Sequence, residues 1–403
     1  MNVLFLTIGR FASIEAHSIY ADLLRCFRDH GHEIYTITPY EIKTGKKTEL
    51  VHEKGAHILH IETGNVTGAN NLISKGIAQV SLEPTYIKAI KTYFSDVKFD
   101  LVLYSTPPIT FSMAVDFVKK RDGAKSYLLL KDIFPQNAVD LGMMTKRGAK
   151  GFIYKYFRRK EKKLYTLSDY IGCMSEANMK YVIKHNPDVD PNKVEVCPNS
   201  VEVVDQSVDE LTKRQIREKY SIPQDKTVFI YGGNLGKPQG IPFLIECLRK
   251  AQSIEEAYFL IIGSGNEYGN LQSFIEQEKP TNAKLLRLLP KEDYDSMVGA
   301  CNVGLIFLDH RFTIPNYPSR LLAYMQAKLP VLACTDPNTD IGKTVVDGGF
   351  GWWCESCDLN GFTKTIKQIL GSDTRKMGII GYNYLINHFS SEKGYDIIMG
   401  RIG

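Results

Sequence analysis

This sequence lacks the features that mark membrane-spanning, secreted and zinc-binding proteins. No apolar run approaches the roughly 18–20 residues that a membrane span needs. The opening residues MNVLFLTIGRF enter a predicted strand without a basic segment, so we expect no signal peptide and a cytoplasmic protein. Cys354 and Cys357 form one C-x-x-C, but no second Cys or His pair stands at zinc spacing. We therefore expect no metal, and we expect all eight cysteines to be reduced thiols.

Strong charge and low-complexity segments are missing as well. The net charge of +5 is too small to call for a nucleic-acid partner. With 43% hydrophobic and 24% charged residues, the chain can bury ordinary cores. Its 403 residues exceed one ordinary core. We therefore predict two domains of roughly 150–200 residues each.

Predicted strands and helices alternate in both halves of the chain, which indicates an α/β fold with parallel sheets. We predict one Rossmann-like domain over residues 1–200 and a polar linker over 201–225. A second such domain follows over 226–375, and a C-terminal helix within 376–403 is expected to pack back on the first domain. The strands are predicted at residues 3–7, 33–38, 57–61, 101–104, 126–130, 170–174 and 194–196, and then at 229–233, 258–263, 285–289, 303–308 and 331–334.

The stretch over residues 226–241, KTVFIYGGNLGKPQGI, predicts a phosphate-binding turn. A buried strand is expected to stop at Gly232 and Gly233, and apolar residues after position 241 recur at helical spacing. Glycines allow close backbone approach, and a helix N-terminus favours negative charge. The alternative is an ordinary strand-to-helix turn. The stretch matches neither G-x-G-x-x-G nor the Walker pattern.

Six segments, in this order, resemble the GT-B fold glycosyltransferases of the large retaining family 4. The resemblance is strongest to bacterial enzymes of capsule and O-antigen synthesis, including N-acetylfucosamine transferases. It implies two Rossmann-like domains facing across a cleft, a UDP-sugar bound mainly by the second domain, and an acceptor bound mainly by the first. The segments are GHEIYTIT, LLLKDIFPQNAVDLGMM, YGGNLGKPQGI, IIGSGNE, PSRLLAYMQAKLPVLA and GGFGWW.

The resemblance implies that the glycine turn and a basic residue near Arg320 hold the donor diphosphate. Fixed donors aimed at a leaving diphosphate stabilise the charge that develops there. No metal is expected, because side-chain cations can supply this charge and no Asp-x-Asp of the sort that metal-dependent transferases use is recognised. Lys237 and Arg320 are the candidate cations; a solvated loop lysine and a surface arginine are the alternatives. The remaining donor-side candidates are Gly233, Asn234, Gly236, Gln239, Gly263, Gly265, Glu267, Pro318, Ser319 and Asp340.

The chain departs from the family pattern at four positions. Asn234 and Gln239 stand where many members have Arg and Lys. The two glutamates of the family's Glu-x7-Glu pair fall on Pro315 and Ala323, so the group that binds the ribose is not identified. Glu267 is one possibility, with a surface residue as the alternative.

On the acceptor side, Asp132 follows a predicted strand and precedes Phe134-Pro135. A carboxylate there could orient or deprotonate an acceptor hydroxyl, or it could cap a turn. Gly9 and Arg10 lie in the first strand-to-helix turn, where Arg10 could meet an acceptor phosphate. Glu15 and His17 are predicted at the start of a helix over residues 15–30, as acceptor contacts or as structural residues.

Residues 146–163, KRGAKGFIYKYFRRKEKK, contain nine basic residues and one acid with aromatic residues between them. Such a helix can lie on anionic lipid, which would suit a lipid-diphosphate-linked acceptor. The alternative is a helix packed on its domain by the same aromatic face. The candidate membrane residues are Phe152, Lys155, Phe157, Arg158 and Arg159.

These observations favour a retaining, metal-independent glycosyltransferase on the inner face of the bacterial cell membrane. A nucleotide-sugar 2-epimerase of the same architecture and a non-catalytic nucleotide- or sugar-binding protein stay open. An epimerase needs a carboxylate- and histidine-rich cleft, and His310 is the only histidine near the predicted donor site. The missing glutamate at Ala323 favours the binding protein.

Overall fold

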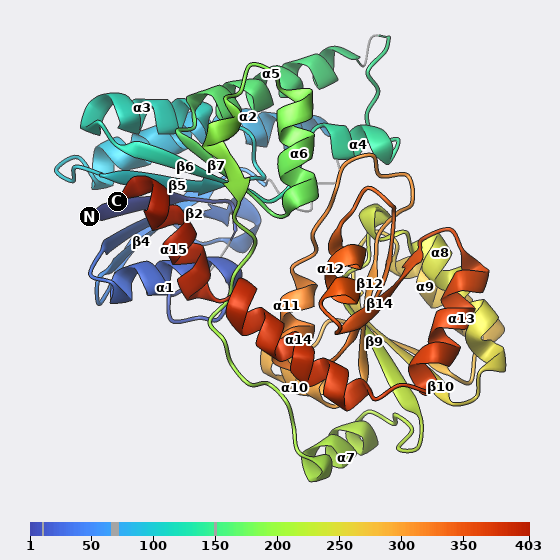
Figure 1. Ribbon diagram of the computed structural model, residues 1–403. Coiled ribbons are helices and arrows are strands. Elements are labelled where there is room, and N and C mark those ends of the chain that lie inside the picture. Colours follow the sequence, from blue (N-terminus) through green and yellow to red (C-terminus); the bar gives the residue numbers. More distant parts are fainter. Residues whose placement is uncertain (10–11, 66–71, 149–150) are drawn as a thin grey trace. The chain divides into compact units, whose positions relative to one another are not determined.

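The computed structural model describes residues 1–9, 12–65, 72–148 and 151–403, and the chain divides into two compact units (Figure 1). The first unit comprises Met1–Glu202 and Ser391–Gly403, and the second comprises Val203–Ser390. Each unit contains its own sheet with helices on both faces, so the predicted α/β class with two Rossmann-like domains is confirmed.

The first unit is built on an eight-stranded sheet with the order β3-β4-β2-β1-β5-β6-β7-β8. All neighbouring strands pair in parallel except the edge strand β3, which runs antiparallel to β4. Strand β3 was not predicted, because its sequence ELVHE is charged and none of its residues is fully buried. The strands are β1 (Asn2–Leu6), β2 (Glu33–Glu41), β3 (Glu49–Glu53), β4 (Ala56–Thr63), β5 (Leu101–Ser105), β6 (Lys125–Leu130), β7 (Tyr170–Cys173) and β8 (Val194–Val196).

Two apolar clusters cover the two faces of this sheet. Because strand side chains alternate, Leu4 and Leu6 join one cluster while Val3 and Phe5 join the other. Burial on both faces explains why these strands read as continuous apolar runs. One cluster takes residues from α2, α3, α5 and α6, and the other takes residues from α1 and α15. The helices are α1 (Ile19–Asp29), α2 (Leu72–Tyr93), α3 (Ser112–Asp122), α4 (Gln136–Asp140), α5 (Gly151–Leu167), α6 (Glu176–His185) and α15 (Ser391–Ile402).

The second unit has a six-stranded, fully parallel sheet with the order β11-β10-β9-β12-β13-β14. Strand β14 was not predicted. The strands are β9 (Thr227–Asn234), β10 (Ala257–Ser264), β11 (Ala283–Leu286), β12 (Val303–Phe307), β13 (Val331–Thr335) and β14 (Gly351–Glu355). The helices are α7 (Glu210–Lys219), α8 (Ile241–Lys250), α9 (Tyr268–Glu278), α10 (Lys291–Gly299), α11 (Arg320–Gln326), α12 (Ile341–Asp347), α13 (Leu359–Leu370) and α14 (Thr374–His388).

The boundaries between the units differ from those predicted. The expected linker over residues 201–225 contains α7, which belongs to the second unit. The expected C-terminal helix is two helices. Helix α14 stays with the second unit, because Gly378 allows it to approach the Lys328 carbonyl closely. Helix α15 packs on α1 in the first unit, where the Tyr395 ring contacts Phe27 at 4.8 Å between centroids.

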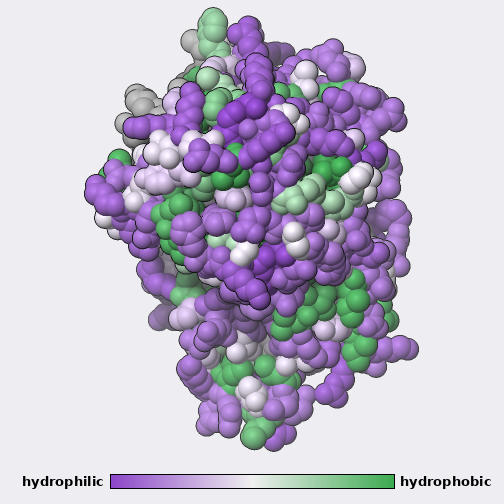
Figure 2. All heavy atoms as spheres, turned by 90° about the vertical axis from the view of Figure 1, so that its left-hand side faces the viewer, coloured by the Kyte–Doolittle hydropathy of each residue, from purple (hydrophilic) through white to green (hydrophobic). Residues whose placement is uncertain are grey.

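Hydrophilic residues predominate on the face shown in Figure 2, and hydrophobic residues form separate patches there. Among the described residues, no helix combines the length and the apolar character that a membrane crossing requires.

Candidate functional site

The glycine turn follows β9 at the carboxyl edge of the second sheet. The predicted strand over 229–233 is confirmed and extends one residue further, to Asn234, because β9 and β10 stay paired through Gly233 and Gly263 to the ends of both strands. Beyond the strand, the Gln239 side-chain oxygen accepts hydrogen bonds from Asn234 Nδ2 at 3.1 Å and from the Gly236 N–H at 3.2 Å. Asn234 and Gln239 therefore brace the turn from within.

Glycines pack this turn against the one that follows β10. A Cβ atom on Gly263 would overlap the Gly233 carbonyl oxygen, and one on Gly265 would overlap the Leu235 carbonyl oxygen. The Glu267 N–H donates to the Leu235 carbonyl at 2.9 Å. The two turns form one rigid edge, and Gly240 continues it into α8 beside a cavity of about 490 Å³.

Arg320 is brought to this edge from a distant part of the sequence. It is the first residue of α11, and its guanidinium carbon lies 4.3 Å from the centroid of the Tyr231 ring. Its Nη2 atom is 3.7 Å from the position that a Cβ on Gly233 would occupy. Its Nη1 atom is buried and has no hydrogen-bond partner. No carboxylate pairs with Arg320 in the described part of the chain, so a cation with unused donors faces the glycine turn.

Three tyrosines surround this arginine, and sequence reasoning missed them. The Tyr324 hydroxyl accepts from the Gly232 N–H at 3.3 Å and donates to the Leu305 carbonyl at 3.1 Å. Tyr231 donates to the Asn234 carbonyl at 2.8 Å. The Tyr294 hydroxyl lies over Gly232, where a Cβ would overlap it. Burial raises the pKa of Tyr294 to about 12, so this phenol is neutral. No sequence signal connects α10 with the turn.

The other donor-side candidates lie in the same unit and differ in their exposure and hydrogen bonds. Lys237 is exposed at the start of a single 3-10 turn. Glu267 accepts a hydrogen bond from Asn270 Nδ2 at 2.6 Å, which is a local contact near the start of α9. Pro318 and Ser319 precede α11, although the Ser319 side chain makes no capping hydrogen bond.

Asp340 precedes α12, and its carbonyl accepts the Thr344 N–H at 2.9 Å. The loop before it is fixed by Asp336, which was not predicted. The buried Asp336 carboxylate accepts the N–H groups of Asn338 and Thr339 at 2.9 and 3.0 Å. Burial raises the pKa of Asp336 to about 6. Asp336 therefore shapes the loop that presents Asp340.

In the first unit, Asp132 follows β6 at the carboxyl edge of the sheet. Both of its carboxylate oxygens lie 2.9 Å from Asn137 Nδ2. Burial raises the pKa of Asp132 to about 6, against the hydrogen bonds from Ile133 and Asn137. The preceding residue, Lys131, was not singled out from the sequence. Burial lowers the pKa of Lys131 to about 8, so both groups titrate near neutral pH. A lysine directly after an apolar strand was the available signal.

Four acceptor-side candidates were predicted in the turn after β1 and at the start of the first helix. Gly9 follows β1, and its N–H donates to Thr7 Oγ1 at 2.9 Å. Arg10 lies outside the described residues. Glu15 and His17 do not lie on a helix, because Ser18 caps α1 and accepts the Ala21 N–H at 3.1 Å.

Both of these side chains contact residues of α1. Glu15 pairs with Arg28, and His17 Nδ1 lies 3.5 Å from Arg25 Nη2. The same Arg25 atom lies 2.7 Å from Asp22 and 2.5 Å from Glu202. These contacts agree with the structural alternative for Glu15 and His17.

Helix α5 separates its basic and aromatic residues into a buried and an exposed group. Arg158 pairs with the buried Glu161 at 2.6 Å and donates to the His185 carbonyl at 2.8 Å. Phe157 packs edge-on against Phe134. The side chains of Arg158 and Phe157 therefore make contacts within the first unit and do not belong to the exposed face of α5. The exposed residues are Phe152, Ile153, Lys155, Tyr156, Arg159, Lys162 and Lys163.

Two Asp-x-Asp triplets occur, and neither lies at the carboxyl end of a strand. Asp190 caps the short turn before β8, and its partner Asp188 is exposed. Asp293 and Asp295 lie on α10, where Asp295 pairs with Lys291 at 2.5 Å.

Comparison with known proteins agrees with this geometry. Residues 212–384 match the family of glycosyl transferases group 1. The whole chain superposes on the sucrose-phosphate synthase of Thermosynechococcus elongatus, with a TM-score of 0.77 at 14% identity, covering 100% of this chain and 98% of that one. This chain has the GT-B fold. HepE of Anabaena in complex with UDP is a further match, with a TM-score of 0.70, 14% identity and 99% of both chains covered.

Two curated relatives of this GT-B chain carry transferase names. One is the "Probable glycosyltransferase WbjE" of Pseudomonas aeruginosa, 26% identical over 323 residues, which are 80% of this chain and 78% of the relative. The other is the "Putative colanic acid biosynthesis glycosyl transferase WcaI" of Escherichia coli (strain K12). It is 23% identical over 212 residues, which are 51% of this chain and 49% of the relative.

Proposed function

We propose that this chain transfers a sugar from a UDP-sugar to a lipid-carrier-linked saccharide in bacterial surface polysaccharide synthesis, with retention at the anomeric carbon. The observation that carries the proposal is the buried, unpartnered Nη1 of Arg320 facing the Gly233 turn. The structural relative in complex with UDP and the relative named for colanic acid biosynthesis support the substrate class. An N-acetylated deoxyamino sugar such as N-acetylfucosamine is the proposed donor sugar.

The reaction needs positive charge where the diphosphate leaves. As the bond between the sugar and the β-phosphate breaks, its electron pair goes to the diphosphate, while the acceptor oxygen bonds to the anomeric carbon. Arg320 supplies a fixed cation with free donors, and Lys237 supplies a mobile one. A preorganised cation at a site with little water stabilises such charge strongly. Arg320 and Lys237 therefore supply the positive charge that the leaving diphosphate requires.

For the ribose we propose Tyr294 in place of the glutamate that Ala323 lacks. Tyr294 lies on α10, which contacts α11, and its hydroxyl lies over Gly232, in the group of tyrosines around Arg320. A neutral phenol can donate to or accept from a ribose hydroxyl. Tyr294→Phe removes only that hydroxyl. It should weaken UDP binding several-fold and leave the binding of inorganic pyrophosphate unchanged; equal effects on both ligands would contradict the assignment.

On the acceptor side we propose that Asp132 orients the acceptor hydroxyl and takes its proton. A carboxyl with a pKa of about 6 is ionised at pH 7 and still basic enough to accept a proton in the transition state. Lys131 is the neighbouring cation and suits a phosphate on the acceptor. Gly9 lies after β1 at the same edge of the sheet, where a Cβ atom would crowd Thr7 and Tyr20.

We also propose that the exposed face of α5 binds anionic lipid on the inner leaflet. Phe152 is 76% exposed and Ile153 is 53% exposed, beside four exposed cations. Replacing Phe152 and Ile153 with serine should reduce binding to phosphatidylglycerol vesicles in sedimentation assays. Met113→Ser serves as the matched control, since Met113 is an exposed apolar residue of the same unit that lies on α3. If the wild-type protein does not sediment with such vesicles at low salt, the proposal of membrane binding is refuted.

Calorimetry with UDP and GDP, followed by transfer assays with a panel of UDP-sugars and lipid-linked acceptors, tests the central proposal. We expect UDP to bind, Lys237→Ala and Arg320→Ala to weaken it, and a sugar to be transferred with release of UDP. Conversion of the nucleotide sugar to its 2-epimer would identify the epimerase alternative. Binding without turnover on any acceptor would identify a binding protein.

A further inference from the structure

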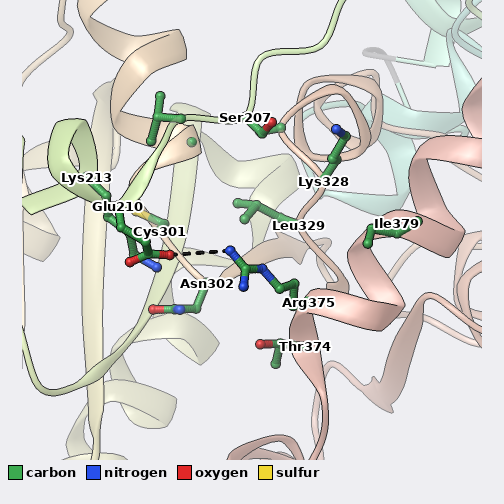
Figure 3. A pocket seen from close by; sticks show the side chains of 13 residues that line it. Ser207, Glu210, Lys213, Cys301, Asn302, Lys328, Leu329, Thr374, Arg375 and Ile379 are labelled. Carbon is green, nitrogen blue, oxygen red and sulfur yellow. Dashed lines mark ion pairs between the residues drawn. The ribbon is translucent and has the colours of Figure 1, made fainter.

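A second cavity lies at the amino edge of the sheet in the second unit, opposite the glycine turn (Figure 3). It has a volume of about 300 Å³. Asn302 lines it just before β12, and Asn302 Oδ1 accepts the N–H of Val228 at the start of β9 at 2.8 Å. The glycine turn starts five residues further along β9, roughly 17 Å away at the rise of a strand. The cavity is therefore separate from the proposed donor site.

The walls of this cavity are fixed by backbone contacts. The segment over residues 203–208 is held by Gln326, whose carbonyl accepts the Gln206 N–H at 2.9 Å. Gly299 allows the same segment to pass closely, and Gly378 allows α14 to pack on the Lys328 carbonyl. Lys328 itself has a φ of 54°, an uncommon conformation for a lysine. A positive φ at a residue other than glycine persists only where the surrounding structure holds the backbone in that conformation.

Cations dominate the charged lining. Lys213, Lys328 and Arg375 line the cavity with a single acid, Glu210. Glu210 and Arg375 face each other across it at 3.7 Å, with side chains 66% and 83% exposed, and such exposed pairs contribute little stability (Figure 3). Lys328 pairs with Asp205 at 2.5 Å.

The third cation, Lys213, is half-buried and has no ion-pair partner among the described residues. Burial, and then the neighbouring Arg217, lower its pKa. Arg217 is itself buried and, within the described residues, donates to neutral acceptors, namely the Asn302 side chain at 2.7 Å and four backbone carbonyls. No carboxylate of the described residues forms an ion pair with Arg217, although Glu210 lies near enough to act on its charge, so the guanidinium adds to the positive potential behind Lys213.

Two helices also begin at this cavity. The first residues of α7 and α14, Glu210 and Thr374, both line it. Helix N-termini carry partial positive charge. The cap carboxylates Asp209 and Asp373 are turned to the N–H groups of their own helices. Leu329 and Ile379 add an apolar side to the lining.

We propose that this cavity binds a small phosphorylated metabolite, with the phosphate between Lys213 and Arg375 and the remainder of the ligand against Leu329 and Ile379. The volume lies at the lower end of small-ligand sites. The chain enters the second unit at Val203 and leaves it at Ser390. A ligand here ties α7, near the entry, to α14, near the exit. The inference does not rest on the proposed transferase activity.

The test is calorimetry of the full chain with inorganic phosphate, glucose 6-phosphate and glucose. Both phosphates should bind with Kd of about 1 mM or tighter, glucose 6-phosphate more tightly, and glucose should not bind. Lys213→Met and Arg375→Gln should each weaken phosphate binding at least tenfold. Lys376→Gln is the matched control, because Lys376 is exposed on α14 outside the cavity. Lys213→Arg keeps the charge and should retain binding.

Hydrogen exchange should also slow in α7 and α14 when glucose 6-phosphate is added, which a merely structural role of Lys213 would not produce. Three results would overturn the proposal. Wild-type protein could fail to bind either phosphate at about 10 mM, which is weaker than any useful site. Lys213→Met could bind as the wild type does. Arg320→Met could abolish binding, which would place the phosphate in the proposed donor site instead.

Discussion

Replacing Arg320 with methionine should weaken UDP binding while leaving the fold intact. The guanidinium has a buried Nη1 without a partner, and a bound diphosphate would give it one. A hydrogen bond from a charged group contributes about 1.5–3 kcal/mol. We therefore expect the Kd for UDP to rise roughly 10- to 150-fold.

The stability of the free protein should change little, because two effects oppose each other. The stacking on Tyr231 at 4.3 Å is lost, at a cost of about 0.5–2 kcal/mol. The substitution also removes the unsatisfied buried donor, which raises the free energy of unfolding by about 1–3 kcal/mol. Methionine keeps an apolar contact with the ring. We expect Tm without UDP to shift by no more than about 4 °C.

Scanning calorimetry with and without UDP separates these effects. With UDP at 100 times the wild-type Kd, the wild type gains about 2.7 kcal/mol. A variant with 30-fold weaker binding gains only about 0.9 kcal/mol. Arg249→Met is the matched control, since Arg249 is an exposed arginine of the same unit that pairs with Glu278. An unchanged Kd for UDP in Arg320→Met, or a large fall in Tm without UDP, would show that Arg320 is structural and refute the reasoning.

Three further variants test other parts of the structure. Burial raises the pKa of Asp132 to about 6, so the wild type loses stability as pH rises from about 4 to 6, and Asp132→Asn should gain relative to it over that range in urea titrations; a constant difference would contradict this. If Asp132 is the base, the wild-type transfer rate should rise through pH 6, and Asp132→Asn should lose that step. Gly263→Ala places a methyl group against the Gly233 carbonyl and should cost about 1–3 kcal/mol of unfolding free energy, whereas Gly269→Ala, where the space is open, should cost nothing measurable. Arg217→Met leaves several buried carbonyls without a donor and should cost about 2–4 kcal/mol, with a lower urea midpoint; an unchanged midpoint would mean that water satisfies those groups.

Local pattern was a good guide wherever burial follows strand or helix periodicity. The run at Val228–Tyr231 reads as a strand because both faces of β9 are covered. The charged edge strand β3 was missed, since none of its residues is fully buried and its stability comes from pairing with β4. Strand β9 was expected to end at its two glycines. It continues to Asn234, because pairing with β10 outweighs the weak intrinsic preference of glycine for strands.

What the sequence determined by itself was the order of most elements and the position of the glycine turn, because strand burial and turn chemistry are local properties. The candidacy of Arg320 came from the family resemblance. What only the tertiary structure decided is which distant side chains meet. Arg320, Tyr294 and Gly232 lie on three elements separated along the chain, and parallel pairing brings them to one edge of the sheet. In the first unit, the neighbouring α6 turns Arg158 inward to the His185 carbonyl, although Lys155 and Arg159 on α5 are exposed. Contacts between distant elements depend on how helices pack on the sheet, and no local pattern encodes that choice.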